Sequence, residues 1–238
     1  SFLATFFSVA VILALGFMGN MVQSNSIGNA FNTAFGVNPL IVGAVCAVIA
    51  GFIFLGGIKR IASFTEKVVP FMAILYIIGC LVILVLNPSG LVAAIQQIFV
   101  GAFAPNAIMG GALGVTVQKA MRYGVARGLF SNEAGMGSTP HAHAAAEVAH
   151  PADQGLVAMM GVFIDTFIIL TMTALVILST GVLGNGETGS VLAQSAFNAG
   201  LGTLGPVFIA FCMLFFAFTT IVGWYYFGEV NVRALFGD

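Results

Sequence analysis

Charge is scarce in this chain. Only 6% of its 238 residues are Asp, Glu, Lys or Arg, whereas soluble domains carry about 25%. Seven basic and eight acidic residues leave a formal net charge of −1, so no strong field attracts a partner of either sign. This scarcity excludes a soluble globular domain, a disordered chain and a nucleic-acid-binding protein.

Cysteine is also scarce, and the common catalytic motifs are missing. The three cysteines, Cys46, Cys80 and Cys212, each lie inside an apolar run, and an odd number of buried thiols argues against a disulfide scaffold. The sequence contains no Gly-x-Ser-x-Gly elbow, phosphate loop or dinucleotide fingerprint. We therefore expect no enzyme and no organic cofactor.

Apolar residues make up most of what is present. They account for 60% of the chain, and the mean hydropathy is +1.09. A bilayer core about 30 Å thick requires roughly 20 apolar residues per helix. Runs of about that size occupy residues 2–22, 39–57, 68–87, 156–183 and 206–228. The sequence predicts an all-α integral membrane protein that crosses the lipid bilayer several times.

A broken apolar region at 92–150 is the first place to look for function. Irregular backbone survives in a membrane only where protein or a water-filled cavity surrounds it. Within this region, residues 128–140 combine turn formers, small residues and one carboxylate, Glu133. A helix ending near Phe130 would expose carbonyl groups, and one starting near Ser138 would expose amide groups. Such ends suit the ammonium and carboxylate of an amino acid; a loop at the membrane surface is the alternative.

Three further polar features lie in apolar runs. Asn20 and Gln23 share a helix face and could orient a small zwitterion or only join helices by hydrogen bonds. Thr219 and Thr220 could bind Na⁺ or bond back to the preceding helical turn. Asp165 must pair, be neutralised or meet water, so proton coupling, helix pairing and cation attraction stay open. His141 and His143 are two residues apart, which does not favour a helical metal site.

The string GLFSNEAGMGSTPHAHAAAEVAHPADQG (128–155) closely resembles the hallmark region of the alanine or glycine:cation symporter family, the bacterial and archaeal sodium:alanine symporters. The segments GNMVQSNSI (19–27) and GGIKRIASFTEKVVPFMAILYIIG (56–79) are similar to that family too. Members are about twice this length. The resemblance therefore implies that residues 1–238 form a single but incomplete transporter domain, an internal fragment lacking core helices at both ends.

The resemblance implies the LeuT-type fold of two inverted five-helix repeats, in which the first and sixth helices are broken. Residues 1–33, 39–57 and 58–87 look like core helices three to five, and 90–104 like an extracellular connection. Residues 106–130 and 138–149 look like the halves of the sixth helix, with Ser131–Gly137 unwound. Residues 152–183 and 205–228 look like helices seven and eight.

The resemblance also implies roles for individual residues. The amino-acid site would be lined by Gly128, Phe130, Ser131 and Asn132, with Asn20 and Gln23 facing them. Beyond the resemblance, we expect Phe130 and Phe17, with Met136 behind them, to form an apolar wall that selects small side chains. The hydroxyls of Thr219 and Thr220 and the Phe216 carbonyl would bind sodium, and the other ligands would come from the first core helix, which this sequence does not contain.

The function so implied is sodium-coupled symport of a small neutral amino acid, alanine or glycine, by alternating access. We expect a monomer in the cytoplasmic membrane of a prokaryote, with sodium as the coupling ion and no cofactor. The main alternative is a LeuT-type carrier for another small solute or with proton coupling. A passive channel and an intramembrane enzyme built on Asp165 or the histidines are the other classes considered.

Overall fold

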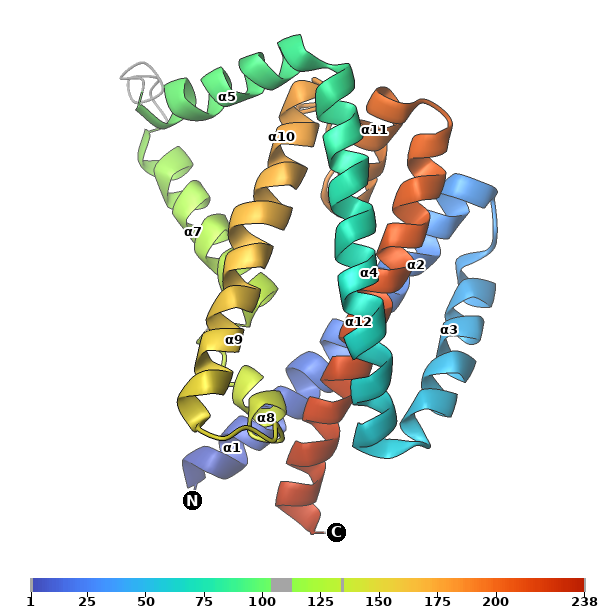
Figure 1. Ribbon diagram of the computed structural model, residues 1–238, viewed down its shortest axis with the longest axis vertical. Helices are drawn as coiled ribbons and strands as arrows, with labels where there is room; N and C mark the ends of the chain where they lie inside the picture. Colours follow the sequence, from blue (N-terminus) through green and yellow to red (C-terminus); the bar gives the residue numbers. More distant parts are fainter. Residues whose placement is uncertain (1, 104–112, 134, 238) are drawn as a thin grey trace. The chain divides into compact units, whose positions relative to one another are not determined.

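The computed structural model describes residues 2–103, 113–133 and 135–237, and all regular structure in these ranges is helical (Figure 1). The chain divides into two compact units. The first comprises residues 1–83 and 182–238, and the second comprises residues 84–181. Each unit is described separately below.

The first unit contains three long helical segments and two shorter helices. Its helices are α1 (Phe2–Val11), the π-helix η1 (Ile12–Gly19), α2 (Asn20–Phe35), α3 (Pro39–Phe54), α4 (Gly57–Leu86), α11 (Gly189–Leu201) and α12 (Leu204–Phe236). The last residues of α4 belong to the second unit. The helices α1, η1 and α2 form one continuous rod of 34 residues.

The turn between α2 and α3 is formed by residues that commonly end and start helices. Gly36 adopts the left-handed conformation at φ 69°, which ends α2. Asn38 then caps α3, because its side-chain oxygen accepts a hydrogen bond of 2.9 Å from the Leu40 amide. Pro39 follows at the first helical position. The hairpin places α3 beside α2, and the two helices line a groove between them.

The core of the first unit lies where α12 packs on α2, α3 and α4. Its buried members are listed here: Ile27, Val42, Cys46, Ala50, Ile53, Ile61, Ala217, Phe218 and Val222. Two glycines face each other where η1 crosses α12, and a Cβ on Gly16 would lie 3.9 Å from the Gly228 Cα, an ordinary van der Waals distance. Small residues at crossings are typical of membrane helices, which gain little from apolar burial alone.

The second unit holds α5 (Pro88–Phe103), α7 (Leu113–Asn132), α8 (Thr139–His143), α9 (Pro151–Phe163), the π-helix η2 (Ile164–Leu170) and α10 (Thr171–Ser179). The helices α9, η2 and α10 run without interruption over 29 residues. The start of α5 is fastened to the end of α10, because the Asn87 amide donates a hydrogen bond of 2.8 Å to the Ser179 carbonyl.

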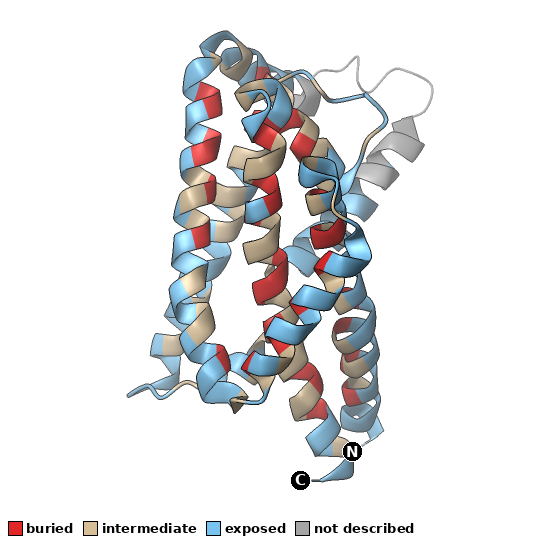
Figure 2. Cartoon of the chain, turned by 90° about the vertical axis from the view of Figure 1, so that its right-hand side faces the viewer, coloured by how far each residue is buried: buried red, intermediate tan, exposed pale blue. Residues whose placement is uncertain are grey.

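The surface has the inverted polarity of a membrane protein. The large apolar side chains of Phe2, Leu40 and Leu55 are 83%, 81% and 89% exposed. The polar side chains of Gln194 and Asn231 are buried. Buried residues form stripes along the helices, and exposed residues cover the remaining faces (Figure 2). Four helical segments are long and apolar enough to cross a membrane. The prediction of an all-α, multi-pass membrane architecture is confirmed at this level.

Two stretches outside the long apolar runs contain helices of their own. Residues 90–104 were expected to form an extracellular connection, yet α5 occupies most of this stretch, started by Pro88. The region 181–205 contains α11, which buries Gln194, Ala196 and Phe197 against its own unit. Only three residues of this helix are buried, and they do not form a long apolar run. The sequence therefore does not reveal the helix, whose stability comes from tertiary packing.

The second half of the broken helix is shorter than predicted. The resemblance assigns it residues 138–149, but α8 ends at His143. The amides of Ala145 and Ala146 bond three residues back, to Ala142 and His143, in the tight turn that ends many helices. The first half was expected from residue 106; residues 106–112 lie outside the described residues, and α7 is described from Leu113.

Candidate functional site

The backbone breaks between α7 and α8, in residues 133–138. Of the described residues here, three have positive φ: Glu133 at 52°, Gly135 at 88° and Gly137 at 79°. Glycine adopts such angles without the steric cost that other residues meet. The break was predicted at Ser131–Gly137, but Ser131 and Asn132 are the last helical residues of α7. A break is therefore present here, but the prediction that Ser131 and Asn132 are unwound is wrong, because the helix continues through both residues.

Hydrogen bonds hold the two ends of this break together. The hydroxyl of Ser138, which is fully buried, donates to a carboxylate oxygen of Glu133 at 2.7 Å. The Thr139 hydroxyl reaches the Glu133 carbonyl oxygen at 3.4 Å. Glu133 thus connects the end of α7 to the start of α8 across a glycine-rich loop, through both its carboxylate and its backbone carbonyl.

The side chains of Ser131 and Asn132 point to η2. The Ser131 hydroxyl donates to Asp165 Oδ2 at 2.7 Å. The Asn132 amide nitrogen donates to Thr166 Oγ1 at 3.0 Å, and the Asn132 amide oxygen lies 3.3 Å from the same hydroxyl. Two adjacent residues of α7 are therefore matched with two adjacent residues of a π-helix, a structure that recurs at functional sites.

The other two residues predicted on α7 are exposed. A Cβ built on Gly128 would meet nothing within 4 Å, and the Phe130 side chain is 44% exposed. Gly128 also supplies the carbonyl that the Asn132 amide approaches at 3.4 Å. The predicted group of Gly128, Phe130, Ser131 and Asn132 thus occupies the last turn and a half of one helix, ending at the break.

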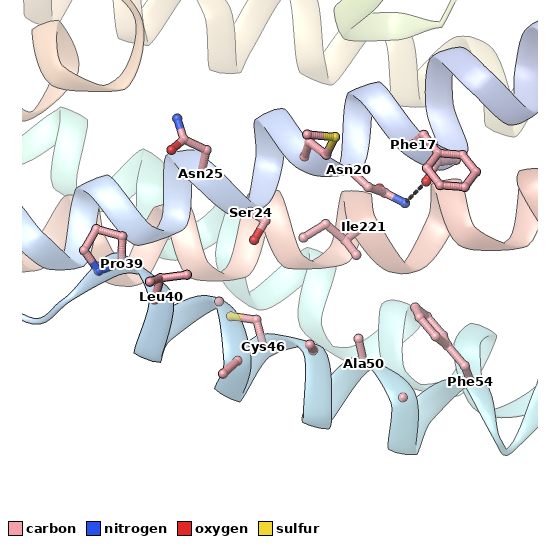
Figure 3. A pocket seen from close by; sticks show the side chains of 16 residues that line it. Phe17, Asn20, Ser24, Asn25, Pro39, Leu40, Cys46, Ala50, Phe54 and Ile221 are labelled. Carbon is pink, nitrogen blue, oxygen red and sulfur yellow. Dashed lines mark hydrogen bonds between the residues drawn. The ribbon is translucent and has the colours of Figure 1, made fainter.

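Asn20 lines a groove of about 880 Å³ between α2 and α3 in the first unit (Figure 3). The Asn20 amide nitrogen donates to the Gly16 carbonyl at 3.1 Å, and its amide oxygen is buried with no hydrogen-bond partner among the described residues. Phe17 and Ser24 also line the groove, whereas the half-buried Gln23 does not. The shared face predicted for Asn20 and Gln23 is therefore not a shared lining of this groove.

The Thr219 and Thr220 hydroxyls both bond within α12. Thr219 Oγ1 lies 2.8 Å from the Phe215 carbonyl oxygen and 3.1 Å from that of Phe216. Thr220 Oγ1 donates to the Phe216 carbonyl at 2.8 Å. The helix continues through this region, so the Phe216 carbonyl is not freed by a break. Each hydroxyl uses its proton in these bonds and keeps oxygen lone pairs for another partner.

The histidines are occupied by local hydrogen bonds. His141 Nδ1 lies 2.8 Å from the Ser138 carbonyl oxygen, and His143 Nδ1 lies 2.6 Å from the Gln154 side chain. His150 Nδ1 accepts from the Ala152 amide and caps α9. Among the described residues, no group of three His, Cys, Asp or Glu side chains gathers as a metal site.

Two contributors were not singled out from the sequence. Thr166 meets Asn132, and its position beside Asp165 in an apolar stretch was the available signal. Gln194 is 2% exposed and donates to the Ala30 carbonyl at 3.1 Å, which joins α11 to α2. Gln194 lies in a stretch of mixed polarity, so nothing in its sequence neighbourhood marks it as buried.

Comparison with known proteins agrees with the resemblance found in the sequence. A family model described as the sodium:alanine symporter family matches residues 1–238. A sodium/alanine symporter of Methanococcus maripaludis is 42% identical over 224 residues, which cover 92% of this chain and 48% of that protein. A sodium/proton-dependent alanine carrier protein of Bacillus sp. strain PS3 is 39% identical over 241 residues, covering 95% and 53%.

An amino-acid carrier protein of Bacillus subtilis is 41% identical over 227 residues, covering 95% of this chain and 48% of that protein. The chain spans about half the length of the curated relatives it matches. The matched family consists of symporters, which are transporters and not enzymes. The match over all 238 residues, together with four apolar helices of membrane-spanning length, shows that the chain belongs to the sodium:alanine symporter family.

Proposed function

We propose that this chain is part of a carrier that couples the entry of a small neutral amino acid, alanine or glycine, to sodium by alternating access. The observation that carries the proposal is the break between α7 and α8, which lies in a chain of this family and puts Ser131 and Asn132 at a helix end. Irregular backbone at membrane depth is typical of transporter sites.

The substrate follows from the chemistry of the break. The last turn of α7 ends in backbone carbonyls that lack helical partners and carry partial negative charge, which suits an ammonium group. Gly128 leaves open space beside this turn, and Phe130 offers an apolar surface. A wall of this kind separates amino acids by about 1–3 kcal/mol per methylene. We propose alanine and glycine as substrates, with Asn20 and Gln23 as further substrate-binding residues.

The coupling ion in this proposal is sodium, bound in part by Thr219, Thr220 and the Phe216 carbonyl. Oxygen ligands without fixed charge suit a hard monovalent cation. Each back-bonded hydroxyl still has oxygen lone pairs, so ion binding would not require its helix bond to break. Proton coupling is the second candidate, because two relatives, one of them described as putative, are named sodium/proton-dependent alanine carriers.

We further propose the LeuT-type fold and a single transporter domain that extends beyond these residues and works as a monomer in a prokaryotic cytoplasmic membrane. The greater length of the relatives supports an extended domain, and the α7–α8 break supports the fold, in which the sixth helix is interrupted. In this scheme sodium and substrate favour the same conformers, which is sufficient for coupling.

The substrate assignment is tested by Asn132→Ala in the full-length protein. Sodium-dependent uptake of labelled alanine should fall at least about tenfold in kcat/KM, equal to about 1.4 kcal/mol, because the end of α7 loses its bond to Thr166. Gln97→Ala, at an exposed position on α5, serves as the control and should leave uptake unchanged. Unaltered uptake by Asn132→Ala would remove this residue from the site.

A further inference from the structure

The first turns of α4 hold most of the basic residues of the first unit. Lys59, Arg60 and Lys67 lie within nine residues of one another, and all three side chains are exposed. The fourth basic residue of this unit, Arg233, is already paired with Glu229 at 2.7 Å. Because Lys and Arg concentrate on the cytoplasmic side of membrane proteins, this stretch of α4 marks where the helix meets the cytoplasmic membrane surface.

Five polar side chains share one face of this stretch. An α-helix turns by about 100° per residue, so the five fall within a sector of about 120°. They are Lys59, Arg60, Ser63, Glu66 and Lys67, and each is exposed. Three basic residues against one acidic residue give this group, called the basic face below, a net charge of +2. A face of this kind attracts anions that lie at the membrane surface.

The opposite side of α4 fixes the direction of the basic face. Ile61 and Met72 are buried, and the Phe64 ring meets the Phe218 ring of α12 edge-on, with 5.8 Å between the ring centroids. A rotation of α4 would pull these side chains out of the core of the first unit. The basic face therefore stays on the outside of this unit.

The same side of α4 becomes apolar further along the helix. The exposed side chains there are Phe71, Ile74, Ile78 and Leu81, and the turn of about 100° per residue places them in line with the basic face. At about 1.5 Å per residue, Ile78 lies about 17 Å beyond Lys67, which is close to half of a hydrocarbon core about 30 Å thick. One side of α4 thus offers polar groups at the level of lipid head groups and apolar groups at the level of acyl chains.

Arg60 is held in place by the end of α3. One guanidinium nitrogen donates to the Phe52 carbonyl at 2.9 Å, and the guanidinium carbon lies 4.9 Å from the centroid of the Phe52 ring. Gly56 makes room for this contact, because a Cβ there would overlap the Arg60 side chain. Arg60 spends one of its N–H donors in this way and retains others for a ligand. Lys59 and Lys67 form no salt bridge with any described residue.

We propose that the basic face binds the head group of an anionic phospholipid, whose acyl chains lie along the apolar continuation of the same side of α4. A phosphodiester supplies the negative charge that Lys59, Arg60 and Lys67 lack, and its oxygens accept hydrogen bonds from ammonium, guanidinium and hydroxyl groups. A zwitterionic head group brings its own positive charge and gains less from this face. The inference goes beyond the proposed function, since it depends on neither the transported solute nor the coupling ion.

The test uses the full-length protein in an uncharged detergent, to which phosphatidylglycerol or phosphatidylcholine is added in increasing amounts. Native mass spectrometry measures the lipid molecules bound at each concentration. The double variant Lys59→Gln/Lys67→Gln removes two charges from the basic face, and Lys59→Arg/Lys67→Arg retains them. Arg233→Gln is the control for charge alone, because this variant removes a charge that Glu229 already neutralises.

The wild-type protein should bind phosphatidylglycerol at least about tenfold more tightly than phosphatidylcholine. The glutamine variant should lose at least about tenfold in affinity for phosphatidylglycerol, because each basic residue near the membrane surface contributes roughly fivefold. The arginine variant and Arg233→Gln should match the wild type. Equal affinity of the glutamine variant and the wild type for phosphatidylglycerol would overturn the proposal. If the double variant does not fold, Lys67→Gln alone decides, with an expected loss of roughly fivefold.

A cysteine probe separates lipid from protein as the occupant of the basic face. Ser63→Cys places a thiol at the centre of this face, while the native thiols of Cys46, Cys80 and Cys212 are buried. An uncharged maleimide should label the new thiol in the full-length protein without added lipid. Phosphatidylglycerol should slow this labelling severalfold, and phosphatidylcholine should not. Failure to label would show that another segment of the protein covers the face, and labelling that neither lipid slows would equally reject the lipid site.

Discussion

At the scale of single residues, the polar minority of this chain is committed to specific partners. Asn132 and Ser131 are held by η2, and Glu133 closes the break through Ser138. These polar side chains, which are rare in a chain of this composition, fix how the end of α7 lies against η2 and how the break is closed. The Asn132–Thr166 and Ser138–Glu133 hydrogen bonds are partly buried, so the loss of one partner leaves the other less well satisfied.

The threonine pair gives a prediction at this scale. Replacing Thr219 and Thr220 together by Val keeps their shape and removes two oxygen ligands, so half-saturating sodium should rise at least about tenfold, equal to about 1.4 kcal/mol of binding free energy. Sodium titration of labelled alanine uptake measures this shift. Thr65 on α4 bonds to the third and fourth preceding carbonyls, as Thr219 does. Thr65→Val should therefore match the wild type; an equal shift in both variants would show that the effect is general.

At the scale of helices, glycine determines where elements meet and where they break. Gly19 allows η1 to approach α12, because a Cβ at this position would lie 2.4 Å from the Trp224 ring. Gly135 and Gly137 serve the opposite purpose, since their positive φ angles keep the chain from continuing as a helix. The same residue type thus acts through its small size in one place and through its backbone freedom in another.

The crossing of η1 and α12 is tested by Gly19→Ala. The added methyl group overlaps a buried, rigid indole, so the variant should lose about 1–3 kcal/mol of stability and unfold at a lower temperature in detergent. Gly223→Ala provides the control on α12, where a Cβ would meet nothing within 4 Å. This control should unfold at or above the wild-type temperature; a lower value for it than for Gly19→Ala would contradict the packing described.

The break is tested by Gly135→Ala and Gly137→Ala. Each forces an alanine into the left-handed region at about 1–2 kcal/mol, which should straighten or strain the segment and lower the maximal rate of alanine uptake severalfold. Gly124→Ala, within α7 and with open space around it, should retain the wild-type rate. Transport that tolerates both break variants would mean that residues 133–138 do not need this backbone conformation.

Element existence was more predictable than element pairing. Apolar runs predict the long helices because length and hydropathy alone set a membrane span, and the glycines of 128–140 predict the break. Helix α11 and the early end of α8 were not predicted, since they depend on buried contacts of Gln194 and on a local turn at Ala145. The hydrogen bond between Ser131 and Asp165 joins residues 34 positions apart. The periodicity of apolar residues within a helix does not predict a contact between residues so far apart in the sequence.

At the scale of the whole molecule, the family and the composition both indicate a protein of the lipid bilayer, and the family is one of membrane transporters. Four segments are long and apolar enough to span a bilayer, and their exposed faces carry large apolar side chains. Family membership adds that related proteins of about twice this length are named as alanine and amino-acid carriers. We propose that the two compact units described here serve one such transport cycle.

The central claim is sodium-driven accumulation of a small amino acid, and uptake into proteoliposomes tests it most directly. The full-length protein is reconstituted, and labelled alanine is supplied outside under an inward sodium gradient, an inward proton gradient or no gradient. The account predicts that alanine inside rises above its outside concentration only with the sodium gradient, and that external unlabelled alanine accelerates exchange. Filling only to the outside concentration, independent of any gradient, would contradict it.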